Sequence, residues 1–358
     1  MKIIIFAGGT GTRLWPLSRK NSPKQFGQIF NGKSTLQLAV ERVEKDFDTE
    51  NVYISTQESY VSMVKQQLPQ IPSSNIVAEP EKRDVAAAIG YNFMRLQKLG
   101  YIGPVAILWA DHTMINVNEF VKALKLGKKL VTKNPKQLVF IGENPRFPNH
   151  NLGWIHVGEK VYDGVHKFLE WHYRPPLEKC KKMFKDGNWF WNPGYFIVDL
   201  NTTIKLYEKF QPDMYKKLSI IRADMGTLDE VKTLKKIYPE IEAISFDDAI
   251  IKNVPAQQAV VITVNMNWAD PGTLYALKES LVKDKNSNYE KGLTYAYETT
   301  DSIIINEDEN KIVTTIGLDG FVIVNTKDAL VVVHRDQVPK VKDVVGYFKK
   351  DGKLKQFI

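Results

Sequence analysis

The chain has 358 residues, of which 43% are hydrophobic and 25% charged, and its formal net charge is +8 at pH 7. These values are typical of a globular protein, and the length allows one large domain and a smaller one. No run of five or more like charges suggests a nucleic-acid-binding tail. A single cysteine, Cys180, excludes an internal disulfide and a cysteine-rich zinc site.

The apolar segments are too short for a membrane span, and the N-terminal run from Ile3 to Ala7 is too short for a secretory signal. We therefore expect a cytoplasmic protein that binds neither membranes nor nucleic acid. The sequence leaves the oligomeric state open, and a homodimer is one form that it allows. By eye, the sequence shows no internal repeat.

In the first half, apolar strand-like runs alternate with segments of helical periodicity. Strands are expected at residues 2–6, 51–55, 76–78, 105–109 and 137–141. Helices are expected at residues 34–45, 57–68, 84–99 and 118–132, with Ser34 as an N-cap. The alternation predicts βαβ units and a mostly parallel, doubly wound sheet. For the whole domain we expect an α/β fold with a Rossmann-like, doubly wound mixed sheet.

From about residue 153 the pattern becomes mixed, and a polar, turn-rich stretch at residues 283–292 marks a boundary. Beyond it, short strands are expected at residues 302–306, 311–316, 321–325 and 330–333, followed by a helix at 337–349. We therefore expect a large domain over residues 1–285 and a small β-rich domain over residues 293–358.

The first expected strand leads directly into a glycine-rich loop that is followed by two cations. The loop contains Gly8, Gly9 and Gly11, and Arg13 and Lys24 come after it. Glycine allows backbone N–H groups to approach an anion closely, and the cations neutralise its charge. At the carboxyl end of a strand, this pattern is typical of a phosphate site.

Residues 7–18, AGGTGTRLWPLS, and residues 23–26, PKQF, resemble the signature of the sugar nucleotidyltransferases, most closely that of the mannose-1-phosphate guanylyltransferases. The resemblance implies a GT-A-like fold with a nucleotide half at about residues 1–150 and a sugar-phosphate half at about 151–285. It implies transfer of GMP from GTP to mannose 1-phosphate, giving GDP-mannose and pyrophosphate. The triphosphate would be held by Arg13 and by the backbone of Ala7, Gly8, Gly9, Thr10, Gly11 and Thr12.

Residues 27–34, GQIFNGKS, also match the Walker A expression. A P-loop requires a buried strand directly before it, whereas the residues before this match are polar and include a proline. We therefore expect a turn and not a phosphate-binding loop here.

Transfer at an α-phosphate requires charge neutralisation and alignment more than acid–base groups. Asp111 follows an apolar strand in LWADH, which resembles the family's LPADH with Trp109 in place of proline. Asp270 lies in WADPGT, which resembles the second metal-binding motif. The resemblance implies that both aspartates hold Mg²⁺, which needs few carboxylates when phosphates and water supply its other ligands. Arg13 and Lys24 complete the predicted catalytic set.

Residues 79–89 resemble the family motif EPxxRNTAPAI, and Glu79, Pro80, Arg83 and Asp84 are therefore candidate nucleotide-binding residues. A glutamate can accept hydrogen bonds from both N1–H and the N2 amino group of guanine. GTP is favoured for this reason, although Asp84 replaces the asparagine of the motif.

The sugar-side motifs match less closely. Gly153 in LGWI resembles the TGYGYI motif, and Asn192 and Gly194 lie in WNPGYF, which resembles WNSGxF. Arg174 takes the place of a lysine that would bind the sugar phosphate, and Glu170 is a candidate for the displaced acid of that motif. These five residues form the predicted sugar-phosphate site.

Two alternatives stay open. Changes at Asp84, Tyr173, Arg174, Pro193 and Lys252 allow a nucleotidyltransferase for another sugar or another NTP. A relative that binds a nucleotide sugar without catalysis is the second alternative, and the glycine loop with both aspartates argues against it.

Overall fold

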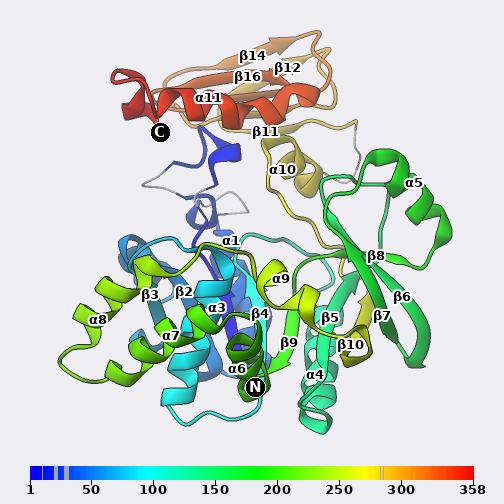
Figure 1. Ribbon diagram of the computed structural model, residues 1–358. Coiled ribbons are helices and arrows are strands. Elements are labelled where there is room, and N and C mark those ends of the chain that lie inside the picture. Colours follow the sequence, from blue (N-terminus) through cyan, green and yellow to red (C-terminus); the bar gives the residue numbers. More distant parts are fainter. Residues whose placement is uncertain (10, 20–22, 28–31, 283, 285) are drawn as a thin grey trace. The chain divides into compact units, whose positions relative to one another are not determined.

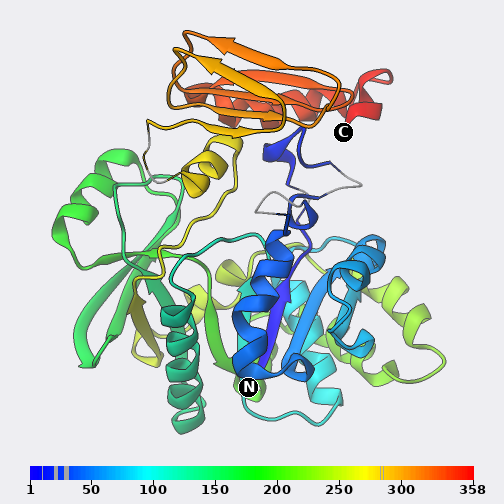
Figure 2. The same ribbon diagram turned by 180° about the vertical axis from the view of Figure 1, so that it is seen from behind.

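The structure is a computed structural model of residues 1–358 that describes every residue except 10, 20–22, 28–31, 283 and 285 (Figures 1 and 2). The described residues form two compact units. The first contains Met1–Gly8, Val40–Trp109 and Met114–Trp268, and the second contains Gly9–Ala39, Ala110–Thr113 and Ala269–Ile358. The second unit is thus assembled from three stretches that are far apart in the sequence.

A ten-stranded mixed sheet in the order β10-β7-β6-β8-β5-β9-β4-β1-β2-β3 is the centre of the first unit. Neighbours β4, β1, β2 and β3 are parallel, so their carboxyl ends meet at one edge, whereas β9 is antiparallel to β4 and β5. The doubly wound mixed sheet is confirmed, but the mostly parallel pairing predicted from the alternation is wrong, because the neighbours from β10 through β7, β6, β8, β5 and β9 to β4 are antiparallel. The strands are β1 (Lys2–Phe6), β2 (Val52–Gln57), β3 (Ile76–Glu79), β4 (Pro104–Trp109), β5 (Leu138–Glu143), β6 (Gly153–Tyr162), β7 (Val165–His172), β8 (Trp189–Asn192), β9 (Phe196–Asp199) and β10 (Ala259–Val264).

Helices cover both faces of this sheet, which explains why its central strands are apolar throughout. On one face lie α1 (Thr35–Phe47) and α4 (Val117–Lys133), and on the other lie α3 (Asp84–Lys98), α6 (Leu200–Phe210) and α7 (Pro212–Asp224) (Figures 1 and 2). The remaining helices of this unit are α2 (Val61–Gln67), α5 (Leu177–Asp186), α8 (Glu230–Ile237) and α9 (Phe246–Ala249). The predicted N-cap of α1 is confirmed, because Ser34 and Gln37 exchange hydrogen bonds of 3.0 and 3.1 Å as a capping box.

The C-terminal part of the second unit consists of short stacked strands. One sheet has the order β11-β13-β15-β16 and a second pairs β12 with β14. The helices are α10 and α11, and Pro339 explains why α11 is preceded by a 3₁₀ turn where one helix is expected. The bounds are β11 (Tyr289–Lys291), β12 (Thr294–Tyr297), β13 (Ile303–Asn306), β14 (Val313–Ile316), β15 (Phe321–Asn325), β16 (Leu330–His334), α10 (Leu274–Leu281) and α11 (Val341–Phe348).

These strands reveal a repeat that inspection of the sequence misses. Parallel partners such as Asn306 and Asn325 lie 19 residues apart, and their side-chain amides are hydrogen-bonded at 2.8 Å. Such stacked parallel strands with an asparagine ladder are typical of a β-helix. This repeat does not stand out by eye in the sequence. The motif is short, IIIN at 303–306 and VIVN at 322–325, and the connections between the copies differ.

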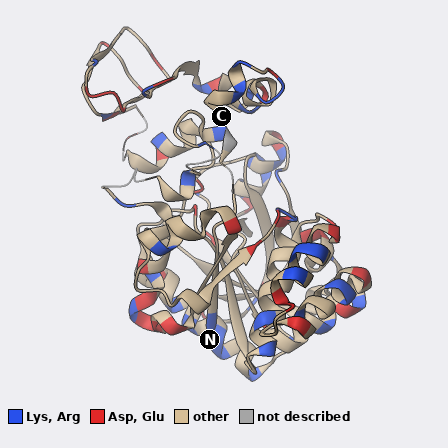
Figure 3. Ribbon diagram, turned by 90° about the vertical axis from the view of Figure 1, so that its left-hand side faces the viewer, with Lys and Arg blue, Asp and Glu red and all other residues tan. Residues whose placement is uncertain are grey.

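The core of the second unit joins residues near the N-terminus to the C-terminal strands. Leu14 packs with α10 and with Ile305 and Val324, while Trp15 packs with Val341 and Val345 of α11. Lys and Arg residues are interspersed with Asp and Glu residues along the helices around the large sheet (Figure 3). Within the described part of the chain, we find no helix with the length and apolar character needed to cross a membrane.

Candidate functional site

The sheet edge where β1, β2, β3 and β4 end is the starting point of the predicted site. Phe6 at the end of β1 is level with Trp109 at the end of β4, and Glu79 is the last residue of β3. The glycine loop and Asp111 therefore continue from adjacent parallel strands. This is the position at which α/β sheets bind ligands.

Two glutamines hold the backbone of the glycine loop. The side-chain amides of Gln57 and Gln25 donate to the carbonyl oxygens of Gly8 and Gly9, each at 3.0 Å. A Cβ atom on either glycine would meet nothing within 4 Å, so open space lies beside this backbone. Sequence reasoning did not identify either glutamine, although the position of Gln25 in the PKQF motif was a signal.

Gly11 is the glycine that the loop requires on steric grounds. Its φ is +59°, and a Cβ atom would lie 2.5 Å from Oγ of Ser18 and 3.0 Å from Cβ and Cγ of Lys24. Only glycine combines this conformation with so close an approach. The loop backbone therefore packs directly on the stem of Lys24.

Lys24 brings the two predicted metal ligands together. Its Nζ lies 2.6 Å from Oδ2 of Asp111 and 3.9 Å from Oδ1 of Asp270, and only 10% of its side chain is exposed. Burial alone would lower the pKa of Lys24, but the two carboxylates outweigh it and raise that pKa. Burial would likewise raise the pKa of Asp111, but the Lys24 ammonium group holds it well below its usual range.

The ammonium group of Lys24 shows that one cation can approach both carboxylates, and these oxygen ligands suit Mg²⁺. Among the described residues, no group of three or more His, Cys, Asp and Glu side chains could hold a metal by itself. The two aspartates thus fit an ion that takes most of its ligands from phosphates and water.

Arg13 lies in a 3₁₀ turn, Thr12–Leu14, and forms no ion pair with any residue that the structure describes. Its guanidinium group is available for a ligand. Thr10 lies outside the described residues, as do residues 28–31 of the Walker A match and the side chain of Thr12. The residues directly before that match form a 3₁₀ turn, Lys24–Phe26, and not the strand that a P-loop requires.

Glu79 is buried and both of its oxygens accept hydrogen bonds. The donors are the hydroxyl groups of Ser55, at 3.2 Å, and Tyr238, at 2.8 Å, and Asn92 donates to Ser55 at 2.9 Å. Burial raises the pKa of Glu79 to about 7, although both hydroxyl groups oppose the shift. Sequence reasoning found Glu79 but not Tyr238, which is 159 residues away in the chain.

The other candidate nucleotide-binding residues follow Glu79 directly. Pro80 comes next, and Arg83 forms an ion pair of 3.1 Å with Glu81. Asp84 begins α3 with a φ of +60°, and its own carboxylate accepts a hydrogen bond from the N–H of Val85 at 2.7 Å. Asparagine and aspartate adopt this conformation more readily than most other residues, so Asp84 can replace the asparagine of the motif here.

Three of the five sugar-side candidates lie together. Gly153 pairs with Asn192 between β6 and β8, and Oδ1 of Asn192 accepts a hydrogen bond from the N–H of Gly194 at 2.9 Å. Trp109, which replaces the proline of the family motif, donates to the carbonyl oxygen of Gly194 at 2.9 Å. Trp109 thus links the strand before Asp111 to this turn.

The two charged candidates have local partners. Glu170 lies 3.6 Å from Nδ1 of His156 and 3.2 Å from Nε2 of His172, and both imidazole rings stack on Trp189. Arg174, at a φ of +46°, donates to the carbonyl oxygen of Asn151 at 3.1 Å. Neither contact tests the predicted binding of a sugar phosphate.

The segment leading to Asp270 is fixed by an acid that sequence reasoning missed. Glu143 at the end of β5 is fully buried and accepts hydrogen bonds from the N–H groups of Met266 and Trp268, at 2.8 and 3.1 Å. Arg146 pairs with Glu143 and donates to the carbonyl oxygen of Trp268 at 2.7 Å. No pattern in the sequence distinguished Glu143 from a surface acid.

Comparison with known proteins gives two family matches. Residues 2–287 match the nucleotidyl transferase family, and residues 296–347 match the MannoseP isomerase/GMP-like beta-helix domain. Mannose-1-phosphate guanylyltransferase RfbM of Salmonella typhimurium is 30% identical, over 98% of this chain and 73% of its own length. A mannose-1-phosphate guanylyltransferase of Escherichia coli is 31% identical, over 97% of this chain and 74% of its own.

The fold has a close counterpart among solved structures. A Thermus thermophilus protein described as a mannose-1-phosphate geranyltransferase superposes with a TM-score of 0.86, covering 97% of this chain and 99% of its own, at 24% identity. Nucleotidyltransferases of this family act on a nucleoside triphosphate and a sugar 1-phosphate and generally use a divalent metal. This chain is a nucleotidyltransferase enzyme, and it belongs to the family of the mannose-1-phosphate guanylyltransferases.

Proposed function

We propose that the protein transfers GMP from GTP to mannose 1-phosphate, releasing pyrophosphate and forming GDP-mannose. The observation that carries this proposal is the cluster of Lys24, Asp111 and Asp270, in the same unit as Gly11 and Arg13. Phosphoryl chemistry of this kind depends on positioning and charge neutralisation, which this cluster can supply. The names of the similar proteins from Salmonella and Escherichia coli support the choice of substrates.

In this proposal the protein aligns two phosphorylated substrates. The backbone N–H groups beside Gly9 and Gly11 and the guanidinium group of Arg13 hold the triphosphate. An oxygen of the sugar 1-phosphate attacks the α-phosphorus, and the bond from that phosphorus to the pyrophosphate oxygen breaks, so no covalent enzyme intermediate is needed. Lys24 turns from the aspartates to a phosphate, where its charge stabilises the transition state. Arg174 neutralises the phosphate of the sugar, and Glu170 is assigned to the same site.

Asp111 and Asp270 would hold Mg²⁺ once Lys24 has turned away. The ion, when bound, would neutralise phosphate oxygens and make pyrophosphate a better leaving group. Lys24 and a divalent cation would then compete for the same two carboxylates, because both are cations that need negative oxygen ligands.

Selection of the two substrates is assigned to two separate groups of residues in the first unit. Glu79, held by Ser55 and Tyr238, would accept hydrogen bonds from guanine, and Pro80, Arg83 and Asp84 would border the nucleotide. Gly153, Asn192 and Gly194 would bind the hexose through backbone groups and the asparagine amide. In this proposal the hydroxyl groups that hold Glu79 leave it lone pairs for a base.

A substrate panel tests the proposal most directly. Each of the common NTPs is paired with several sugar 1-phosphates, and pyrophosphate release is measured. GTP with mannose 1-phosphate should give the highest kcat/KM. If another pair is clearly preferred, the proposed substrates are wrong, although nucleotidyl transfer is supported. If no pair releases pyrophosphate, the proposed reaction is wrong.

The metal assignment predicts the effect of Asp111→Ala. Turnover should fall by at least about a hundredfold, because the variant loses a ligand of the proposed ion. Mn²⁺ binding to the protein without substrates, measured by calorimetry, should weaken in parallel, while Lys24→Met should bind Mn²⁺ more tightly. Asp163→Asn, which breaks an exposed ion pair with Lys160, is the control and should change neither quantity. Wild-type turnover in Asp111→Ala would rule out this assignment.

A further inference from the structure

Residues 14–19, which follow Arg13, are anchored in the C-terminal strands and helices of the second unit. Leu14 packs in the apolar core of that unit, and Trp15 contacts α11 and donates from Nε1 to the carbonyl oxygen of Phe357 at 2.6 Å. Arg13, one of the two cations assigned to the phosphates, is therefore followed directly by residues that the C-terminal part holds in place. Apolar packing accounts for the stability of this contact.

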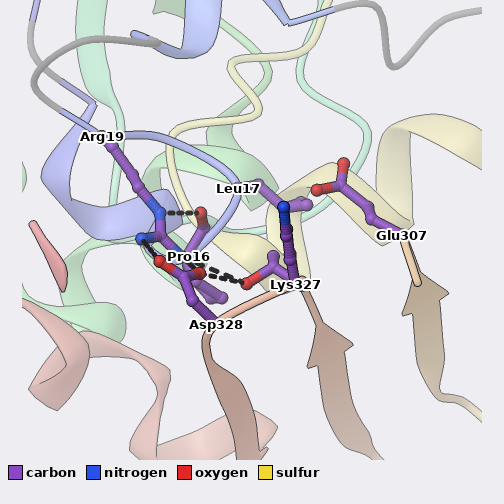
Figure 4. Close-up of a pocket in the computed structure, with 7 residues that line it drawn as sticks. Pro16, Leu17, Arg19, Glu307, Lys327 and Asp328 are labelled. Carbon is purple, nitrogen blue, oxygen red and sulfur yellow. Dashed lines mark hydrogen bonds and ion pairs between the residues drawn. The ribbon is translucent and has the colours of Figure 1, made fainter.

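Arg19 adds a polar contact of a different kind, shown in Figure 4. Its two terminal nitrogens donate to both carboxylate oxygens of Asp328, at 2.7 and 2.5 Å, and one of them also donates to Oγ1 of Thr326 at 3.1 Å. Its Nε donates to the carbonyl oxygen of Pro16 at 3.2 Å. One planar guanidinium group thus connects the signature segment to the turn between β15 and β16.

The geometry of this contact is specific to arginine. A bidentate pair with a carboxylate fixes orientation as well as distance, and a lysine cannot reproduce it while also binding Pro16 and Thr326. The hydrogen bonds from Arg19 hold the pKa of Asp328 below its usual value. The pair borders an open cavity of about 540 Å³, so on that side hydrogen bonds and not packing confine the guanidinium group.

We propose that Arg19 and Asp328 are positioning residues for nucleotidyl transfer, through which the β15–β16 turn sets the position of the segment that bears Arg13 and Lys24. The inference rests on the phosphate-binding roles proposed for those two cations. Asp328 is 44% exposed, and ion pairs this exposed contribute little to global stability. The effect of the pair is therefore expected in catalysis and not in folding.

The test compares Asp328→Asn, Arg19→Lys and the double variant with wild type. Both single variants should lose at least about fivefold in kcat/KM for the nucleotide, because small displacements of phosphate-binding groups are costly in this chemistry. The loss in the double variant should be close to that of either single variant, since the two residues act as one unit. The melting temperature should change little in all three.

A second measurement keeps this inference separate from the proposed reaction. Amide hydrogen exchange of peptides covering residues 11–19 is recorded without substrates, and it should be faster in Asp328→Asn and unchanged in the control Asp163→Asn. Wild-type exchange and kinetics in the variants would overturn the inference. A parallel fall in kcat/KM and melting temperature would do the same, because it would show a purely structural contact. If the protein prefers other substrates, the hydrogen-exchange result still shows whether Asp328 holds residues 11–19 in place.

Discussion

Glu79 is a buried carboxyl group that affects the stability of the fold and is also the residue proposed to recognise guanine. It is 7% exposed, and the two hydroxyl groups that bind it are neutral, so its ionised form is poorly compensated. Burial accordingly raises its pKa from 4.5 to about 7. The native state then holds the proton of Glu79 more tightly than the unfolded chain does. Glu79 therefore favours folding at low pH, and this contribution is lost as the pH rises from about 4.5 through 7.

The prediction at this scale concerns Glu79→Gln, which keeps the shape of the side chain but cannot ionise. Between pH 5 and pH 8, wild type should lose on the order of 3 kcal/mol of unfolding free energy that the variant does not lose. Urea unfolding at both pH values measures the difference. The same pH dependence in both proteins would show that Glu79 does not titrate in this range. The variant should also bind GTP less tightly if Glu79 recognises guanine.

Among the elements, α10 has the most direct connection to the proposed metal site. The helix begins after Thr273, whose hydroxyl accepts from the N–H of Ala276 at 3.2 Å, and Thr273 comes three residues after Asp270. At its other end, Lys278 is fully buried and lies 2.5 Å from Asp301. Tyr275 and Arg335 also bind the carboxylate of Asp301. This cluster fixes α10 against the C-terminal strands, and with it the chain that follows Asp270.

Lys278→Met is the corresponding prediction. The variant leaves Asp301 without its buried ammonium partner, and we expect a loss of about 3 kcal/mol, the lower end for a broken buried pair, because Tyr275 and Arg335 still bind the carboxylate. Chemical denaturation gives the value. Lys311→Met, which breaks the exposed pair with Asp308 in the same unit, should have little effect. Equal stability of the two variants would mean that the cluster does not hold α10.

For the whole molecule, the match to the nucleotidyl transferase family ends before the core of the second unit is complete. That match covers residues 2–287, yet Leu14, Leu274 and Leu277 pack against strands β13 and β15, which lie beyond it. The proposed catalytic groups Lys24, Asp111 and Asp270 belong to this unit. We therefore expect these proposed catalytic groups to depend on the C-terminal strands for their support. The boundary expected between residues 285 and 293 stays a prediction.

We accordingly predict that a chain ending at residue 287 loses nucleotidyl transfer and aggregates, because it exposes the apolar side chains of α10 and Leu14. Ile305→Ala in the full chain should give a milder form of the same defect, with a loss of about 2–5 kcal/mol for the cavity in a fully buried core. Turnover and light scattering are measured for both. A truncated chain with wild-type kcat/KM would show that the C-terminal strands are dispensable.

The local features of the chain were predictable because they depend on neighbouring residues. Periodicity placed β1–β5 and α1–α4 to within a few residues, whereas β6–β10 were not placed, and Ser34 was recognised as a cap. The glycine loop, Asp111 and Asp270 could be proposed from the sequence because each lies in a short motif. Arg13 follows the loop closely, so the sequence alone indicates that glycine backbone and a positive charge can act on the same anion. These parts of the candidate site depend on local sequence.

Only the tertiary structure decided which of these groups lie close together. It also decided which residues without a motif of their own hold them in place. Lys24 and Asp270 approach each other across more than two hundred residues, and Arg19 and Asp328 are 309 apart. Tyr238 and Gln57 bind residues of the candidate site, and Glu143 binds the segment before Asp270. None of the three lies in a recognisable functional motif. The physical reason is that hydrogen bonds and ion pairs require particular distances and angles in space. Local sequence determines the helix, strand or loop on which a side chain lies. The packing of distant strands and helices determines which other groups that side chain contacts.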